Sequence, residues 1–382
     1  MTARQVPPHS ASGPAADPLH VAMTVEQCWQ RVPGGSASYI VALLAALQER
    51  QDVRTTGLSA AHRGRPPADH SPTGPVRAFP LPRYALYRAW NALSGPRAEW
   101  LVPGADVVHA TTWAIPPTRR PLVVTVHDVA FLRDPTHFTP RGVRFFTRAL
   151  DRTRDEAAAV IVPSQATADD CVSAGIEAGR IHVVPHGAPT WIVTQGEVDA
   201  LRDRLGLPER FVLWCGTFEP RKNVDGLLAA FELLAEHDPS VHLVLVGPTG
   251  WGEAHRAPHG RWAARVHQVG RLSTSDLRVA YAAATAFCFP STWEGFGLPV
   301  LEAMSVGTPV VTSAGTSMAE VVGDAGILVD PADPAQIAAG LLRAVGEERE
   351  ELGGAALARS RDFTWARAAD LTVAAYRAAQ GA

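Results

Sequence analysis

Lysine is nearly absent from this chain. Of its 35 basic residues, Lys222 is the only lysine, and all the others are arginine. A compact ammonium group kept in such a sequence can neutralise a phosphate as a point charge. Lys222 stands between an apolar run from Phe211, which predicts a strand, and an amphipathic stretch up to Phe231, which predicts a helix. Taken alone, the pair Arg221 and Lys222 is more typical of a solvated surface before a helix.

Cysteine and long apolar runs are also scarce. The cysteines form no C-x-x-C pair, which argues against a disulfide framework, so we expect free, buried thiols in a cytoplasmic protein. No apolar run approaches the roughly 20 residues that span a bilayer. Residues 1–18 lack the apolar core of a secretory signal and are predicted to be a disordered lead-in. The cysteines are Cys28, Cys171, Cys215 and Cys288.

A strong net charge of one sign is missing too. The formal net charge is −3, with a slightly basic first half and an acidic second half. This imbalance is too small to predict a nucleic-acid partner. The basic first half is compatible with an anionic ligand or a membrane surface.

The segment Ser291–Val311, STWEGFGLPVLEAMSVGTPVV, is the most informative part of the chain. The apolar run Thr285–Pro290 before it predicts a buried strand. Pro299 suits the start of a helix, and Gly307 would end that helix. The order is therefore strand, acidic glycine loop, short helix, a geometry that lets backbone N–H groups approach an anion.

Two carboxylates frame this loop. Glu294 lies in the loop and Glu302 is expected in the first helical turn, so both can flank one bound molecule. Carboxylates accept hydrogen bonds from paired hydroxyls, as on a sugar or a ribose. Together with Lys222 and Arg221 they favour a ligand that is anionic in the middle and rich in hydroxyls at both ends. A nucleotide diphosphate sugar is such a ligand.

These motifs resemble those of a retaining glycosyltransferase of family 4, which has the two-domain GT-B fold. The resemblance rests mainly on GTFEPRKN and on EGFGLPVLEAMSVGTPVV, whose spacing of Glu294 and Glu302 is the family's motif, and it extends over roughly residues 19–379. Further matching segments are Val32–Gly35, Val124–Phe131, Val162–Thr167, Val183–Pro189, Val269–Leu277 and Gly323–Pro331.

The fold that this resemblance implies is α/β, with two Rossmann-like domains facing each other across a cleft. Strands and helices alternate along the chain, which independently predicts parallel sheets. We expect an N-terminal acceptor domain over 19–190, a donor domain over 205–363 and a C-terminal helix over 364–382 that packs back on the first domain. A hinge is expected at 188–208, and a surface loop at 57–82. Strands are predicted to start near His20, Asp106, Leu122, Ala158, Ile181, Phe211, Val241, Arg265, Thr285, Thr308 and Gly326.

The resemblance also implies which residues form the site. Lys222, Arg221, Glu294 and His127 are the expected catalytic residues, with His127 placed against the transferred sugar. The residues expected to contact the donor are Gly35, Arg271, Phe296, Gly297, Leu298 and Glu302. Many family members carry an arginine where this chain has Thr217, so the second phosphate cation must come from Arg221 or from elsewhere.

The implied activity is transfer of a hexose from a nucleotide diphosphate sugar, with GDP-mannose as the donor preferred by resemblance. The acceptor would be a glycan, a lipid-linked molecule or a small molecule. No cofactor is expected, and the absence of any D-x-D pair argues against a catalytic metal. A non-catalytic binding subunit and another GT-B enzyme, such as a sugar epimerase, stay open as alternatives. A dehydrogenase fits poorly, because Pro299 and the framing glutamates do not suit a dinucleotide loop.

A helix predicted over Arg141–Arg154 places Arg141, Arg144, Arg148 and Arg152 on one face, with Phe145, Phe146 and Leu150 elsewhere. A solvated basic face explains this pattern. The sharper interpretation is a patch for anionic lipid or a lipid-linked acceptor, to which Arg83–Leu93 would add aromatic residues, and it would imply peripheral contact with the inner face of the membrane.

Overall fold

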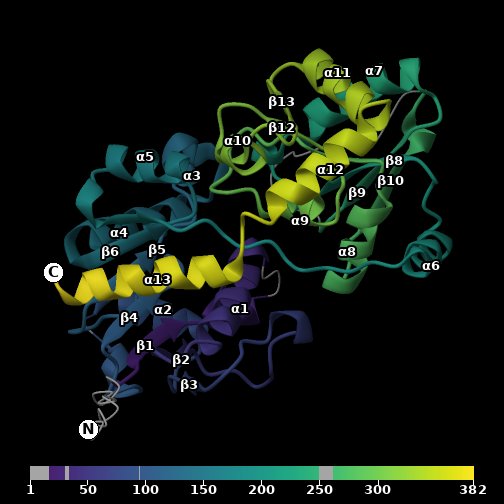
Figure 1. Ribbon diagram of the computed structural model, residues 1–382. Helices are drawn as coiled ribbons and strands as arrows, with labels where there is room; N and C mark the ends of the chain where they lie inside the picture. Colours follow the sequence, from purple (N-terminus) through teal and green to yellow (C-terminus); the bar gives the residue numbers. More distant parts are fainter. Residues whose placement is uncertain (1–16, 31–33, 94, 249–260) are drawn as a thin grey trace, which may run out of the picture.

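The computed structural model describes residues 17–30, 34–93, 95–248 and 261–382. Nearly all of the expected lead-in, 1–18, and half of the segment Val32–Gly35 lie outside these residues. The chain forms two α/β lobes, and the view in Figure 1 separates them clearly. No helix in the described ranges is long and apolar enough to cross a bilayer.

A seven-stranded parallel sheet forms the centre of the N-terminal lobe, in the order β3-β2-β1-β4-β5-β6-β7. This order, which runs outward from β1 in both directions, is that of a doubly wound nucleotide-binding fold. Its strands are β1 (Leu19–Thr24), β2 (Val53–Ser59), β3 (Val76–Ala78), β4 (Val107–Ala110), β5 (Leu122–Thr125), β6 (Ala157–Val162) and β7 (Ile181–Val183). The helices around it are α1 (Gly34–Gln48), α2 (Arg83–Ala92), α3 (Ala130–Arg133), α4 (Pro140–Glu156) and α5 (Gln165–Ser173).

The C-terminal lobe repeats this plan with a six-stranded parallel sheet, in the order β10-β9-β8-β11-β12-β13. Its four inner strands are almost wholly buried, as expected when helices cover both faces of a parallel sheet, whereas the edge strand β10 is partly exposed. The strands are β8 (Phe211–Cys215), β9 (His242–Val246), β10 (Val266–Gly270), β11 (Ala286–Phe289), β12 (Val310–Ser313) and β13 (Ile327–Val329). The helices are α6 (Gln195–Leu205), α7 (Val224–His237), α8 (Thr274–Ala283), α9 (Leu298–Ser305), α10 (Ser317–Val322), α11 (Pro334–Val345) and α12 (Arg349–Ser360).

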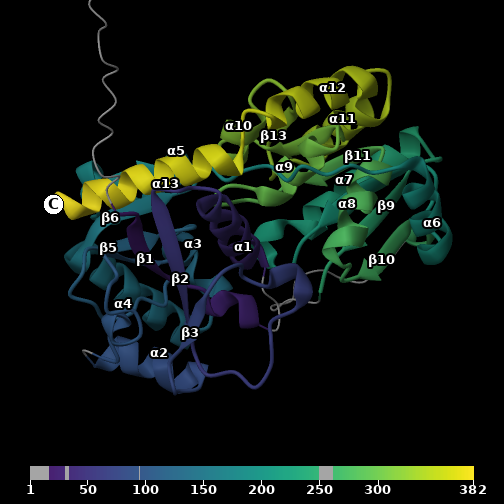
Figure 2. The ribbon, with the colours of Figure 1, turned by 60° about the horizontal axis from the view of Figure 1, so that its bottom comes forward.

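The last helix, α13 (Trp365–Gln380), crosses back to the N-terminal lobe and packs on its sheet and on α1 (Figures 1 and 2). A hydrogen-bond chain fixes it there. The Tyr376 hydroxyl lies 2.7 Å from His109 Nδ1, and His109 Nε2 lies 2.7 Å from Thr125 Oγ1. Burial lowers the pKa of His109 to about 3, so its ring is neutral and needs both partners.

The expected strands all form, each starting within two residues of its predicted position, and all pair in parallel. All four cysteines are free and buried, which confirms that prediction. The surface loop predicted at 57–82 is wrong in part. Its first residues belong to β2, and β3 lies inside it. Gly57 interrupts the apolar pattern of β2, and β3 is a short, exposed edge strand with no apolar signal.

We expect Tyr376→Phe to lower the free energy of unfolding by about 1–3 kcal/mol, because it leaves a buried ring nitrogen of His109 without a partner. Thr372→Val on the same helix is the matched control, since the buried Thr372 hydroxyl has no hydrogen-bond partner among the described residues. Urea unfolding of the three proteins measures both effects. Equal stability of Tyr376→Phe and the parent would contradict this account of how α13 is held.

Candidate functional site

The ten predicted site residues all line one cavity of about 610 Å³ between the lobes, which we call the central cavity. The topology explains this convergence, since in parallel sheets the loops after the strands meet at the same edge. His127 follows β5, and Lys222 follows β8. Glu294 follows β11, and Gly35 opens α1 after β1. The lining includes Lys222, Arg221, Glu294, His127, Gly35, Arg271, Phe296, Gly297, Leu298 and Glu302.

A buried ion cluster occupies the floor of the central cavity. Lys222 Nζ lies 2.5 Å from Glu294 Oε1, and Arg221 Nη1 lies 2.9 Å from the same oxygen. Arg221 Nε also pairs with Glu219 Oε2 at 3.0 Å. Lys222 and Glu294 are each only 8% exposed, so these charges are largely removed from water. The cluster holds two cations and two carboxylates, and it therefore balances internally.

The charge states in this cluster follow from its geometry. Burial would raise the pKa of Glu294, but Arg221 and Lys222 together lower it to about 2. Burial and the like charge of Arg221 lower the pKa of Lys222, against the pull of Glu294. Burial opposes the charge of Arg221, yet Glu294 and Glu219 raise its pKa. Glu294 is thus an ionised acceptor of hydrogen bonds at neutral pH.

The loop that carries Glu294 is attached to the N-terminal lobe. The Gly295 carbonyl accepts hydrogen bonds from Ser164 Oγ at 2.7 Å and from Thr167 Oγ1 at 3.0 Å. A Cβ on residue 295 would lie 1.7 Å from the His127 carbonyl oxygen, so only glycine fits. On the C-terminal side, Ser317 Oγ donates to the Glu294 carbonyl at 2.7 Å. Both lobes therefore fix the backbone of the loop that carries Glu294.

Glu302 forms a second polar group in the lining of the central cavity. It lies in the second turn of α9, because the helix starts at Leu298, and the prediction of the first turn is therefore wrong. Tyr281 OH donates to Glu302 Oε2 at 2.9 Å and lies 2.8 Å from Cys215 Sγ. Burial raises the pKa of Glu302 to about 7, and the Tyr281 hydrogen bond partly opposes this rise.

His127 lies in the same cavity as a neutral ring. Burial lowers its pKa, and Nε2 lies 3.0 Å from the Thr111 carbonyl. Because only an N–H can bond a carbonyl, Nε2 carries the proton and Nδ1 is an acceptor. Its ring contacts Tyr39 edge to face, with centroids 5.0 Å apart, and lies against His186 at 6.0 Å.

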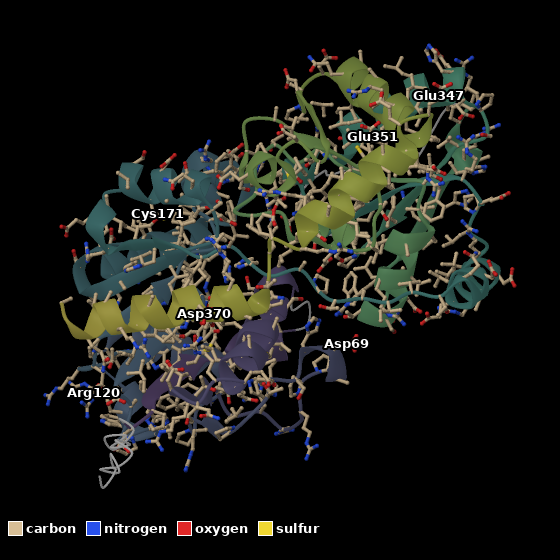
Figure 3. The ribbon with its side chains drawn as sticks, viewed as in Figure 1. Asp69, Arg120, Cys171, Glu347, Glu351 and Asp370 are labelled. Carbon is tan, nitrogen blue, oxygen red and sulfur yellow. The ribbon has the colours of Figure 1, made fainter. Side chains whose placement is uncertain are left out.

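Several residues of this site escaped the sequence analysis. Tyr281 carries no signal of its own in the sequence, although it orients Glu302. His70, in the predicted surface loop, is buried and lines the cavity. Its neighbour Asp69 accepts from Thr274 N at 3.2 Å across the two lobes, and Figure 3 shows it at the edge facing the C-terminal lobe. Polar residues in a Pro- and Gly-rich stretch carry no periodic signal, so no pattern could have found them.

A metal site is a separate question. Within the described ranges, no three His, Cys, Asp or Glu side chains gather so as to hold a metal ion. The expectation of a metal-free site stays a prediction.

The raised pKa of Glu302 predicts a pH-dependent stability. A carboxyl with a raised pKa favours the folded state below its ordinary pKa of 4.5 and loses this contribution as pH rises through about 7. Glu302→Gln cannot ionise, so its Tm relative to the parent should rise between pH 4.5 and pH 8. Tyr281→Phe removes the opposing hydrogen bond and should move the transition to higher pH. Thermal melts across this pH range test the prediction. A Tm difference between Glu302→Gln and the parent that does not change with pH would refute the raised pKa of Glu302.

Comparison with known proteins gives a consistent result. A family model described as Glycosyltransferase Family 4 matches residues 33–191, and one described as Glycosyl transferases group 1 matches residues 209–347. The O-antigen chain mannosyltransferase B of Escherichia coli is 31% identical over 320 residues, which are 80% of this chain and 83% of that protein. The MMP alpha-(1->4)-mannosyltransferase of Mycolicibacterium hassiacum is 32% identical over 325 residues, with coverages of 79% and 76%.

A solved structure extends the likeness to the whole architecture. The Anabaena protein HepE, in complex with UDP and glucose, superposes with a TM-score of 0.69 at 21% identity, covering 93% of this chain and 98% of that one. Its likeness bears on the fold, whereas the sequence relatives bear on the family. Two parallel-sheet lobes, a ligand-sized cavity between them and these relatives lead to one conclusion: the chain belongs to glycosyltransferase family 4 and has the GT-B fold.

Proposed function

We propose that this protein is a retaining hexosyltransferase that uses a nucleotide diphosphate sugar, with GDP-mannose as the preferred donor. The observation that carries the proposal is the central cavity, where Lys222, Arg221, Glu294 and Glu302 surround a space large enough for one such donor. The two mannosyltransferase relatives favour mannose as the sugar. The acceptor belongs to the glycans, lipid-linked molecules or small molecules.

The donor diphosphate takes the place between the cations and the glycine loop. Lys222 and Arg221 neutralise the charge that grows on the leaving group. The backbone N–H groups of Phe296, Gly297 and Leu298 at the start of α9 add hydrogen-bond donors. Gly297 adopts φ 98°, a left-handed conformation that favours glycine and turns the chain into the helix. Arg221 thereby supplies the second cation that Thr217 does not.

The two glutamates hold the uncharged ends of the donor. Glu294, ionised and carried by a loop fixed from both lobes, accepts hydrogen bonds from hydroxyls of the transferred sugar. Glu302, which Tyr281 holds in the same lining, accepts from the ribose diol. When the donor binds, Lys222 exchanges part of its contact with Glu294 for the phosphate. Glu294 thus holds the ammonium in position before the substrate arrives.

Transfer occurs with attack on the same face as departure. The bond between the anomeric carbon and the phosphate oxygen breaks, and its electron pair leaves with the nucleoside diphosphate. The acceptor oxygen forms the new bond, and its proton passes to the departing phosphate oxygen. His127 contacts the transferred sugar through its ring and requires no proton exchange. No protein nucleophile takes part in this scheme.

Lys222→Ala and Glu294→Ala are each expected to reduce turnover at least about 100-fold, because each removes a charge aimed at the reacting centre. Nucleoside diphosphate release with the donor measures the effect, and circular dichroism checks the fold. Arg119→Ala, which removes an exposed arginine outside the central cavity, is the matched control. Undiminished turnover in either site variant would remove that residue from the mechanism.

Thermal unfolding with UDP-, GDP-, ADP- and dTDP-linked sugars, and separately with NAD, tests the donor class. Binding to the folded state raises Tm as the ligand concentration increases. At a ligand concentration of 100 times Kd, the free energy of unfolding rises by about 2.7 kcal/mol. We expect a shift with GDP-mannose that Lys222→Ala abolishes. A shift with a different nucleotide sugar would correct the base, and a shift with NAD alone would overturn the proposal.

A further inference from the structure

A second, larger cavity of about 1150 Å³ adjoins the central cavity in the N-terminal lobe. The two share the strip that contains Gly35, His127, Asp128 and Arg221. Much of the wall of the larger cavity comes from α2 and α4, and five arginines of these two helices line it in addition to Arg221, so we call it the arginine cavity. They are Arg83, Arg88, Arg141, Arg144 and Arg148.

Ion pairing distinguishes the arginines of α4 that line this cavity from the other arginines of the same helix. Arg152 pairs with Glu156 at 2.7 Å and donates to the Ile115 carbonyl, and Arg154 pairs with Asp151. Arg152 was expected on the same face as the other three, but these contacts hold it outside the cavity.

The three arginines that remain, Arg141, Arg144 and Arg148, form no ion pair with any described residue. A solvated basic face on this helix would mix paired and unpaired arginines, yet here the unpaired ones all face one cavity. Like charges gathered in this way repel one another, and an anion between them would relieve the repulsion.

Aromatic rings lie among these arginines. Tyr84 and Tyr87 from α2, with Phe145 and Phe146 from α4, line the same cavity. The guanidinium of Arg141 lies 5.0 Å from the centroid of the Tyr84 ring, which holds this exposed side chain over the cavity. Phe145 and Phe146 were expected on a different part of the helix from the arginines, but they line the same cavity. Such a surface suits a ligand with an apolar or sugar-ring face next to an anionic group.

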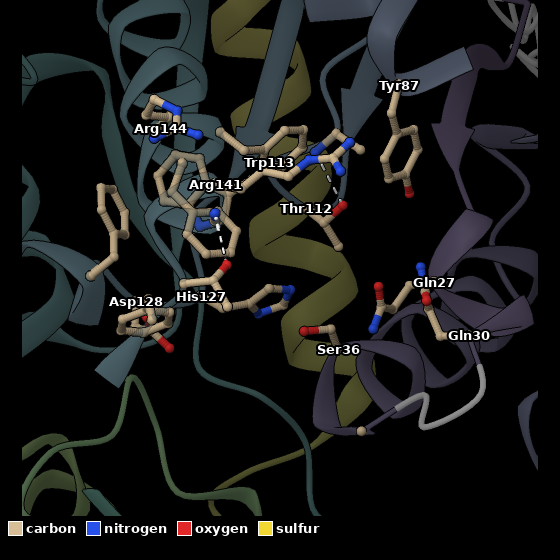
Figure 4. A pocket seen from close by; sticks show the side chains of 18 of the residues that line it. Gln27, Gln30, Ser36, Tyr87, Thr112, Trp113, His127, Asp128, Arg141 and Arg144 are labelled. Atoms are coloured by element: carbon tan, nitrogen blue, oxygen red, sulfur yellow. Dashed lines mark hydrogen bonds between the residues drawn. The ribbon is translucent and has the colours of Figure 1, made fainter. Parts of the chain in front are cut away.

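The position of the arginine cavity relates it to the reaction. Figure 4 shows Arg141 and Arg144 above His127 and Asp128, with Gln27 and Gln30 on the other side of the view. A molecule seated here reaches the strip shared with the central cavity. It therefore approaches the donor from the N-terminal lobe, where an acceptor must lie.

We propose that the acceptor carries a phosphate or diphosphate group, which Arg141, Arg144 and Arg148 bind while its sugar or lipid portion contacts the aromatic rings. This inference rests on the proposed transferase function and specifies its acceptor class. Arginine suits the task, because its planar fork binds phosphate oxygens in pairs. The phosphate belongs either to a lipid-linked diphosphate or to a soluble sugar phosphate.

The test uses isothermal titration of the full chain with three probes. Geranyl diphosphate represents a lipid-linked diphosphate, mannose 6-phosphate a soluble phosphate ester, and methyl α-mannoside a neutral sugar. The variant Arg141→Gln, Arg144→Gln, Arg148→Gln should lose about tenfold or more in affinity for the anionic probe that binds, equivalent to about 1.4 kcal/mol. Replacing the same three by lysine keeps the charge but loses the paired contacts, so it should recover only part of the lost affinity.

A matched control removes three exposed arginines elsewhere on the lobe, Arg77→Gln, Arg119→Gln and Arg120→Gln. Figure 3 shows Arg120 at the far end of the lobe, away from the C-terminal lobe. This variant has the same net charge as the test variant. It should bind the anionic probe like the parent, and a loss equal to that of the test variant would overturn the proposal as a non-specific charge effect.

Each outcome has a distinct meaning. Selective binding of geranyl diphosphate assigns the phosphate to a lipid, and selective binding of mannose 6-phosphate assigns it to a soluble ester. If neither anion binds more tightly than methyl α-mannoside, the proposal of a phosphate site in the arginine cavity is refuted. The Tm shift with GDP-mannose, measured on the same variants, should persist. If that shift is absent from the parent while the anion binds, the donor assignment fails and the anion site stands.

Discussion

The buried contact of Glu294 with Lys222 and Arg221 is the interaction on which the site depends. A carboxylate removed from water is costly unless cations and hydrogen bonds compensate it, and here two cations bind a single oxygen. Removing either cation would leave an unbalanced charge in a nearly dry place. Because the partners come from the loops after β8 and β11, the same contact sets how these loops lie against each other. The geometry of the candidate site and the local fold therefore share one electrostatic origin.

The relation between the lobes depends on backbone geometry at one position. The Gly295 carbonyl accepts from Ser164 and Thr167 of the N-terminal lobe, and its Cα lies too close to the His127 carbonyl for any side chain. Glu320 adds a further contact, since its carboxylate accepts from the first two N–H groups of α5. These contacts place His127 and Glu294, from different lobes, in one cavity. A movement of one lobe relative to the other would therefore change the distance between His127 and Glu294.

The sequence predicted those parts of the molecule that carry periodic or compositional signals. Buried parallel strands are continuous apolar runs, so the strands from Phe211 and Thr285 were visible, and the acidic glycine loop followed one of them. The role of Tyr281 was not visible, because its contact with Glu302 depends on how α8 packs beside α9. The polar residues Ser164 and Asp69 meet the other lobe only in three dimensions. For β3, a short exposed edge strand, no pattern existed to be found.

The unequal use of the two basic residues now has a structural explanation. At residue 222 the side chain must fit between Glu294 and the ring of Phe289, whose centroid lies 4.8 Å from Nζ, with the Arg221 guanidinium already beside it. A second planar fork would crowd the first, whereas a compact ammonium fits and keeps donors free for another anion. In the arginine cavity the requirement is the opposite. The cations there are exposed and the cavity is wide, so planar groups that can stack on aromatic rings, as Arg141 does on Tyr84, are favoured. The chain thus has lysine where little space is available and arginine where a planar, directional group is needed.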